Sequence, residues 1–393
     1  MKLQVGIIFG GQSVEHEISV ISANQAMNAL NKEKFDLVPI YISKEGKFYT
    51  GNELIDLGNY GNLNSLITKL EEVTFVRRNN VTNLEPVKKS IFNNKSIKVD
   101  VVIPIVHGVN VEDGNLQGYL HTLKVPFAGC DVTSAAVGQD KVIQKAVLSA
   151  NDVKTAPWFW LYANDFESNK DVFITKANKL GYPLIIKPAK LGSSIGIEIV
   201  NNDHELETMV KECGKYDPKL LIEKVITNFK EINIAIMGNS NSYKLSVMEE
   251  VLKNDDILSF NDKYLSSNKT KGVKQSTKGS KGMASTTRKV PAEVSLDIKK
   301  LIEKEAIKAF KAIGVTGNCR IDFMYDEKNN EIYLTEVNTI PGSLAFYLWN
   351  ECDISFDKLL EEMIDIAIEK ERINDKVVVS FDTNILQGFA KRS

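Results

Sequence analysis

The residues best suited to chemistry in this 393-residue chain lie in a predicted β-hairpin, CRIDFMYDEKNNEIYLTEVN, at residues 319–338. Because side chains alternate between the two faces of a strand, Arg320 and Asp322 share one face, and so do Glu336 and Asn338. Two carboxylates and an amide carbonyl form an oxygen-only site, which suits Mg²⁺ bridging nucleotide phosphates. Arg320 lies beside them in the predicted hairpin, and its positive charge could stabilise an oxyanion that develops during a reaction. The alternative, a cross-strand charge cluster, does not easily explain two acids and an Asn on strands that are otherwise so apolar.

A second candidate site, IIKPAKLGSSIGI at residues 185–197, combines a lysine with a glycine-rich turn. Lys187 ends an apolar predicted strand, and the loop that follows carries Ser193 and Ser194 among its glycines. Backbone N–H groups and hydroxyls in such a loop can bind phosphate oxygens, with Lys187 as a point charge. The loop is not a Walker A motif, since G-x-x-x-x-G-K-[ST] occurs nowhere in the chain. An ordinary β-hairpin is the alternative.

Two further glycine turns follow predicted buried strands. In FGGQSVEHE, Ser13 can cap the following helix, and Glu15 could hold the ammonium group of a zwitterionic substrate. In HGVNVEDGNLQG (107–118), a histidine and two acids crowd the carboxyl end of a strand, where open α/β sheets bind ligands. The alternatives are a capped helix whose early acid complements the helix dipole, and a turn with capping acids. No G-x-G-x-x-G dinucleotide fingerprint is present at the first turn.

A basic stretch from Lys263 to Ala292 carries eight lysines and arginines and no acid. One interpretation is a solvated loop. The other is an active-site lid that neutralises polyphosphate charge.

The elements that must position these residues begin with a β-α-β unit. Residues 3–9 and 36–42 are apolar runs typical of buried parallel strands, with a helical pattern between them. A third apolar run at 99–106 ends in His107. A short helix is expected at 63–70. Antiparallel hairpins are expected later in the chain, at 231–252 and 319–338, and a last amphipathic helix at 356–371.

The expected fold class is α/β, with an N-terminal Rossmann-like parallel-sheet domain followed by two α+β subdomains. The expected boundaries are an N-terminal domain at 1–130, a central subdomain at 131–230, a C-terminal subdomain at 231–372 with the basic lid at 263–292, and a tail at 373–393 that contains one strand, VVVSF.

Composition excludes several classes of protein. A formal charge of −2 argues against a protein that mainly binds nucleic acid, and 43% hydrophobic residues exclude wholesale disorder. Four scattered cysteines and four scattered histidines indicate neither a disulfide framework nor a zinc site. No stretch approaches the ~20 apolar residues of a membrane helix, and the N-terminus lacks a signal sequence. We therefore expect a cytoplasmic, multidomain enzyme.

Taken in order, the motifs resemble the D-alanine–D-alanine ligase family of the ATP-grasp superfamily over about residues 3–372. The matching segments are FGGQSVEHEIS, HGVNVEDGNLQG, GQDKVIQK, KPAKLGSSIG, IEKV, KEINIAIMG, KY, RIDF and EVNTIPG. In that family ATP phosphorylates the carboxylate of a first D-alanine, and the amine of a second amino acid attacks the acyl phosphate. The resemblance thus implies a cytoplasmic enzyme of peptidoglycan precursor synthesis and, as in other family members, a homodimer.

The resemblance also implies a role for each matching residue near the substrates. Glu15 corresponds to the acid that holds the first substrate's ammonium, and His107 to the family's histidine near that substrate. Together, Glu15, Ser193 and Tyr264 correspond to a hydrogen-bonded trio that couples the lid to the active site. Arg320 corresponds to the arginine on the tetrahedral intermediate.

For ATP and its metal the resemblance implies three groups of residues. The phosphate-binding positions are Lys141, Lys187, Ser193, Ser194 and the lid lysine Lys263. The adenine hinge and the ribose-binding acid are Glu223, Lys224, Ile226 and Glu231. The ligands of two Mg²⁺ ions, or of Mn²⁺, are Asp322, Glu336 and Asn338.

The chain departs from the family pattern after Gly342, where the segment EVNTIPGSLAFYLW is shorter. Ser343 and Leu344 are expected to replace the usual Ser-Leu pair that holds the second substrate's carboxylate. A rebuilt pocket, reshaped by Phe346, Tyr347 and Trp349, is the alternative. The expected product is D-alanyl-D-alanine. The alternatives are a ligase whose second substrate is D-serine, D-lactate or another amino acid, and a non-catalytic ATP-binding protein.

Overall fold

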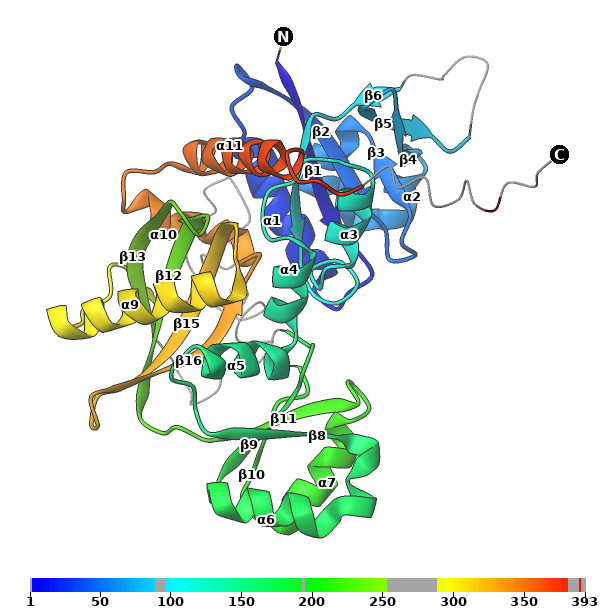
Figure 1. Ribbon diagram of the computed structural model, residues 1–393. Coiled ribbons are helices and arrows are strands. Elements are labelled where there is room, and N and C mark those ends of the chain that lie inside the picture. The colour runs from blue at the N-terminus through cyan, green and yellow to red at the C-terminus, as the bar shows by residue number, and fades with distance from the viewer. Residues whose placement is uncertain (1, 89–95, 193–194, 253–287, 381–388, 390–393) are drawn as a thin grey trace, which may run out of the picture.

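Three sheets dominate the computed structural model, which describes residues 2–88, 96–192, 195–252, 288–380 and 389. The N-terminal sheet has seven strands, the middle sheet four and the third sheet five. Figure 1 shows the third sheet between the other two, with the four-stranded sheet at the far end of the molecule.

The seven-stranded sheet has the order β6-β5-β4-β3-β2-β1-β7. β1 is central and runs parallel to both β2 and β7, which confirms the predicted β-α-β opening. The remaining neighbours pair antiparallel. The strands are β1 (Leu3–Gly10), β2 (Phe35–Ile42), β3 (Phe48–Thr50), β4 (Glu71–Arg78), β5 (Val81–Pro86), β6 (Ile97–Lys98) and β7 (Val101–Val106). β7 is buried at every residue because it is covered on both faces.

Helices from both ends of the chain cover this sheet. α1 (His16–Ala29) and α11 (Phe356–Asn374) lie side by side against it, although more than 300 residues separate them (Figure 1). Their apolar faces join one hydrophobic core with β1 and β7. α11 also contacts β12 and β15, so it ties the first sheet to the third. The short helices near this sheet are α2 (Leu63–Ile67) and α3 (Asn115–Thr122), and α4 (Val132–Gln139) follows them and contacts α5 and β16.

The four-stranded sheet is antiparallel, with the order β10-β9-β11-β8. Its strands are β8 (Trp158–Tyr162), β9 (Leu184–Pro188), β10 (Glu198–Val200) and β11 (Lys219–Lys224). α6 (Lys170–Leu180) and α7 (Asp203–Cys213) pack on one face around a small apolar core (Figure 1). α5 (Lys141–Ala150) contacts β11 and α9, and so links this sheet to the next.

The five-stranded sheet has the order β14-β13-β12-β15-β16 and is antiparallel throughout. Its strands are β12 (Phe229–Gly238), β13 (Tyr243–Val251), β14 (Arg288–Lys289), β15 (Gly317–Asp326) and β16 (Glu331–Asn338). α9 (Leu296–Ile313) packs its apolar stripe against one face. α10 (Phe346–Asn350) follows the sheet. Both predicted hairpins are confirmed by the pairing of β12 with β13 and of β15 with β16.

Local predictions differ from the structure at three places. The strand predicted in VVVSF is wrong for residues 377–380, which join no sheet and expose Val377, Val378 and Val379 by 58–79%, because no strand edge lies beside them. Ser13 does not occupy the N-cap of α1, which is Glu15, although Ser13 Oγ accepts a hydrogen bond from the Glu15 N–H. The helix predicted at 63–70 ends at Ile67, preceded by a 3₁₀ turn.

Candidate active site

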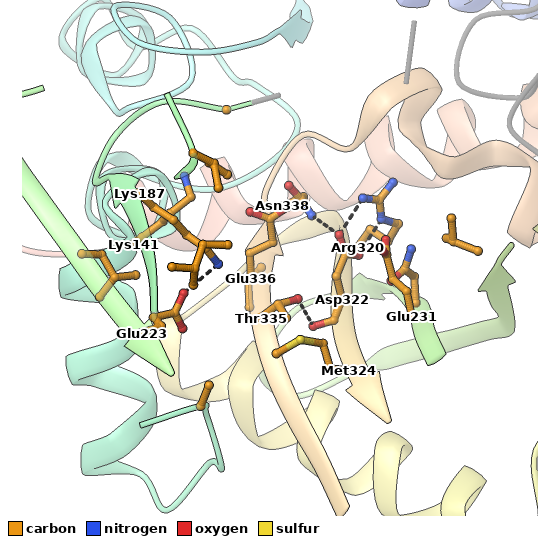
Figure 2. A pocket seen from close by; sticks show the side chains of 18 of the residues that line it. Lys141, Lys187, Glu223, Glu231, Arg320, Asp322, Met324, Thr335, Glu336 and Asn338 are labelled. Atoms are coloured by element: carbon orange, nitrogen blue, oxygen red, sulfur yellow. Dashed lines mark hydrogen bonds and ion pairs between the residues drawn. The ribbon is translucent and has the colours of Figure 1, made fainter. Parts of the chain in front are cut away.

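A cavity of about 800 Å³ lies where the three sheets meet. Its walls come from the carboxyl ends of β1 and β7, from β9 and β11, and from the open face of the five-stranded sheet. Figure 2 shows the lysines of the middle segment on one side, facing acidic and amide groups of β15 and β16 on the other. The predicted phosphate-binding and metal-binding residues are therefore brought to one place.

Glu223 is the centre of a buried charge cluster on the middle wall. Its carboxylate forms ion pairs with Lys187 at 2.7 Å and with Lys145 at 2.5 Å, and both Glu223 and Lys145 are almost fully buried. Burial alone would raise the pKa of Glu223, but the two lysines outweigh it and hold the pKa at about 2. Lys141, one helical turn before Lys145, lines the same cavity and donates its Nζ to the Leu191 carbonyl at 2.6 Å. Burial lowers the pKa of Lys141.

On the opposite wall, Arg320 and Asp322 form a two-point ion pair. Arg320 Nε and Nη2 each donate to a separate Asp322 oxygen at 2.7 Å, and Asn338 Nδ2 donates to Asp322 at 2.9 Å. Strand register sets Arg320 opposite Asn338 and Asp322 opposite Glu336, as the two-residue period predicts. Burial raises the pKa of Asp322 to about 6 even beside Arg320.

The carboxylates and the amide on this wall fit a hard divalent cation. Asp322, Glu336 and Asn338 all line the cavity with oxygen donors. A carboxylate has about four lone-pair sites, so Asp322 can serve Arg320 and an ion together. Within the described ranges, no group of three or more His, Cys, Asp or Glu side chains could hold a metal ion.

Glu15 and His107 meet at the end of the cavity formed by the first sheet. The Glu15 carboxylate lies so close to Gly192 that a Cβ there would stand 2.7 Å from Glu15 Oε2, so a larger residue at 192 would displace the Glu15 carboxylate. Burial lowers the pKa of His107 and keeps its ring neutral, and the ring is hydrogen bonded to the backbone of Ile340. His107 Nε2 is buried and has no hydrogen-bond partner among the residues that the structure describes.

Near His107, Glu112 connects two loops of the cavity. It accepts the Gly108 N–H at 2.9 Å and also binds the backbone of Ile340. Burial, with the charge of Glu15, raises the pKa of Glu112 to about 8.

The residues predicted for adenine and ribose line the cavity, at the junction of β11 and β12: Glu223, Lys224, Ile226 and Glu231. The Lys224 ammonium donates to the Gly181 and Tyr182 carbonyls at 2.6 and 3.1 Å, which fixes this junction to the segment before β9.

Ser343 and Leu344 are not brought into the cavity lining, which ends at Gly342. Both are 1% exposed, and residues 343–345 have positive φ values near 50°, which turn the chain away from the cavity. The aromatic residues beyond them enter three different environments: Trp349 is fully buried, Phe346 stacks on Phe356, and Tyr347 binds Glu249. Ser193, Ser194, Lys263 and Tyr264 lie outside the described residues.

Four residues received no role from the sequence: Glu112, Asn233 and Glu249, which line the cavity, and Lys145, which pairs with Glu223. A signal existed for Lys145, because it lies four residues after Lys141 on one helix and so shares its face. Arg288 belonged to the basic stretch, and only the pairing of β14 with β13 brings it to the cavity.

The first sheet contains parallel strands, and two antiparallel sheets follow it along the chain. The cavity that they enclose is lined by lysines and carboxylates. This arrangement defines the chain as an ATP-grasp protein. Sequence models described as D-ala D-ala ligase N-terminus and D-ala D-ala ligase C-terminus match residues 4–130 and 147–365. The chain belongs to the D-alanine–D-alanine ligase family.

Relatives and solved structures agree with this family. The chain is 36% identical to the D-alanine–D-alanine ligase of Thermosipho melanesiensis over 386 residues, which cover 98% of each protein. It is 33% identical to that of Natranaerobius thermophilus, over 97% of this chain and 99% of the relative.

Among solved structures, the D-alanine–D-alanine ligase of Coxiella burnetii superposes with a TM-score of 0.77 at 27% identity, covering 95% of this chain and 96% of that one. The VanG D-Ala:D-Ser ligase of Enterococcus faecalis also has a TM-score of 0.77, at 26% identity, covering 93% of this chain and 100% of that one.

No helix within the described ranges has the length and apolar character needed to cross a membrane.

Proposed function

We propose that this enzyme joins two D-alanine molecules with ATP, through an acyl phosphate, to supply a peptidoglycan precursor. The observation that carries the proposal is the cavity itself, where Lys141 and Lys187 face Asp322, Glu336 and Asn338. Lysines on one wall and oxygen donors on the other suit a triphosphate with its metal ion.

In the first step, a carboxylate oxygen of the first D-alanine attacks the γ-phosphorus of ATP, and the bond to the β-phosphate oxygen breaks. ADP and the acyl phosphate result. Glu15 is suited to the substrate's ammonium because its carboxylate lies beside Gly192 in the cavity. The neutral ring of His107 directs its unpartnered Nε2 to the same end. Both residues would orient the carboxylate for attack.

In the second step, the amine of the second D-alanine attacks the acyl carbon. The new C–N bond forms, the C–O bond to phosphate breaks, and inorganic phosphate and the amine's proton leave. Arg320 is suited to the oxyanion of the tetrahedral intermediate, because its pairing with Asp322 fixes the guanidinium in one orientation.

Asp322, Glu336 and Asn338 would hold Mg²⁺, or Mn²⁺, as two ions. Bound there, the metal supplies charge neutralisation for the phosphates. When Lys187 binds a phosphate, its ion pair with Glu223 breaks or is shared with the phosphate. Lys145 continues to neutralise the charge of Glu223.

A second candidate differs only in the acceptor. Ser343 and Leu344 lie behind the cavity wall, and one structural neighbour is a D-Ala:D-Ser ligase. D-Serine is therefore the alternative second substrate.

The experiment is an ADP-release assay with D-alanine, D-serine, D-lactate and several L-amino acids, each alone and in pairs, with mass spectrometry of the products. We expect D-alanyl-D-alanine from D-alanine alone. ADP release that needs no amino acid, or a mixed product that dominates in competition, would reject the proposal.

Four further proposals rest on family membership and on the fold. The enzyme works in the cytoplasm, forms a homodimer and binds no nucleic acid, and its domains divide near residues 130, 230 and 372. Size-exclusion chromatography with light scattering would test the dimer.

A further inference from the structure

Arg288 lies in a polar cluster on the five-stranded sheet that the reaction described above does not use. Its side chain is only 8% exposed yet lines the cavity, and its Nη1 binds the fully buried Glu249 at 2.7 Å. Glu249 also accepts the Asn233 amide and the Tyr347 hydroxyl, each at 3.0 Å. The Arg288 guanidinium stacks on the Tyr347 ring, 4.4 Å from its centre. An ion pair with Glu249 and a ring contact with Tyr347 thus hold the guanidinium at the cavity wall.

The cluster borders the proposed reaction centre. Asn233 pairs with Glu249 on one side and with Asp322 on the other. Arg320 pairs with Asp322 and lines the same cavity as Arg288. An amino acid bound to Arg288 would therefore have its amine near the acyl carbon that Arg320 is suited to stabilise.

Asn233 supplies a hydrogen-bond acceptor in addition to the N–H donors of Arg288. Its Nδ2 is committed to Glu249, and its buried Oδ1 has no hydrogen-bond partner within the part of the chain that the structure describes. A buried carbonyl oxygen left without a donor costs free energy, so a ligand N–H is the expected partner. A guanidinium beside an amide oxygen matches the carboxylate and the amine of an α-amino acid.

We propose that Arg288 binds the carboxylate of the second amino acid and that Asn233 Oδ1 accepts a hydrogen bond from its amine. A guanidinium has five N–H donors, so it can bind a substrate carboxylate in addition to a protein carboxylate. This assignment rests on the ligase function proposed above. It also gives the shortened segment after Gly342 a role, because that segment supplies Tyr347, which orients Arg288, while Ser343 and Leu344 lie behind the wall.

The test separates the two halves of the reaction. Hydroxylamine traps the acyl phosphate as D-alanine hydroxamate and has no carboxylate, so hydroxamate formation reports on ATP and the first substrate alone. Dipeptide formation needs the acceptor as well. The variants are Arg288→Met and the double variant Arg288→Met/Glu249→Gln, which leaves no uncompensated buried charge. The matched control is Lys289→Met, since Lys289 is next in the strand but pairs with Glu293 at the surface.

In both Arg288 variants we expect the KM for the acceptor D-alanine to rise about 10- to 100-fold, as for a lost hydrogen bond to a charged group. Hydroxamate formation should stay within about twofold of wild type, and the preference for D-alanine over D-alaninamide as acceptor should shrink. Lys289→Met should change none of these values.

Two results would overturn the assignment. Hydroxamate formation that falls as much as dipeptide formation in the double variant would make Arg288 a phosphate ligand or a structural residue. An unchanged acceptor KM would show that the carboxylate binds elsewhere. Wild-type enzyme that forms no hydroxamate from D-alanine and ATP would instead reject the ligase function itself.

Discussion

Glu223→Gln should destabilise the four-stranded sheet by about 3 kcal/mol at neutral pH. The Glu223 side chain is 4% exposed and Lys145 2% exposed, with 2.5 Å between their charged atoms. Removing one partner of a buried ion pair typically costs about 3–5 kcal/mol, because the other charge stays buried without compensation. The pKa gives a similar figure: the fall from the ordinary 4.5 to about 2 corresponds to about 3 kcal/mol, at about 1.4 kcal/mol per pH unit.

The assay is native-state hydrogen exchange of the β11 amides, which reports local opening free energies and needs no two-state unfolding of the whole chain. We expect these free energies to fall by about 3 kcal/mol in Glu223→Gln. In Lys145→Met/Glu223→Gln they should return to within about 1 kcal/mol of wild type, because the more deeply buried lysine is gone and the remaining Lys187 side chain is 19% exposed.

The pH dependence follows from the lowered pKa of Glu223. A group whose pKa is lowered by folding stabilises the protein above its unfolded-state pKa and loses that contribution as the pH falls through its folded-state pKa. The advantage of wild type over Glu223→Gln should therefore be constant above about pH 4.5 and shrink toward pH 2. A double variant as unstable as the single one, or an advantage that does not change below pH 4.5, would refute this reasoning.

Two further predictions concern catalysis. Arg320→Lys should lower turnover about 10²–10³-fold with little change in the KM for ATP. The reason is that a lysine cannot replace the two guanidinium N–H donors that pair with Asp322. An equal loss of ATP binding would show that Arg320 is a phosphate ligand. Glu336→Gln should nearly abolish ADP release by removing one metal carboxylate, and EDTA should do the same to wild type. ADP release that persists in EDTA would contradict the metal site.

The sequence predicted the parts of the site that short-range rules control. The two-residue period of strands placed Arg320 with Asp322 and Glu336 with Asn338, and the register of β15 and β16 confirms that arrangement. Apolar runs predicted β1, β2 and β7, because a strand covered on both faces has few polar residues. The same rule failed at residues 377–380, since an apolar run forms a strand only where another strand lies beside it.

Long-range partners required the tertiary structure. Nothing in the sequence shows that the buried Lys145 pairs with Glu223, 78 positions away, or that Arg288 stacks on Tyr347. The sequence by itself determined the residue types, the local periods and, by resemblance, the family. The tertiary structure decided which groups share a cavity and which, like Ser343, lie behind its wall. The physical reason is that charge pairing and burial depend on distances between elements, which chain packing sets and local spacing does not.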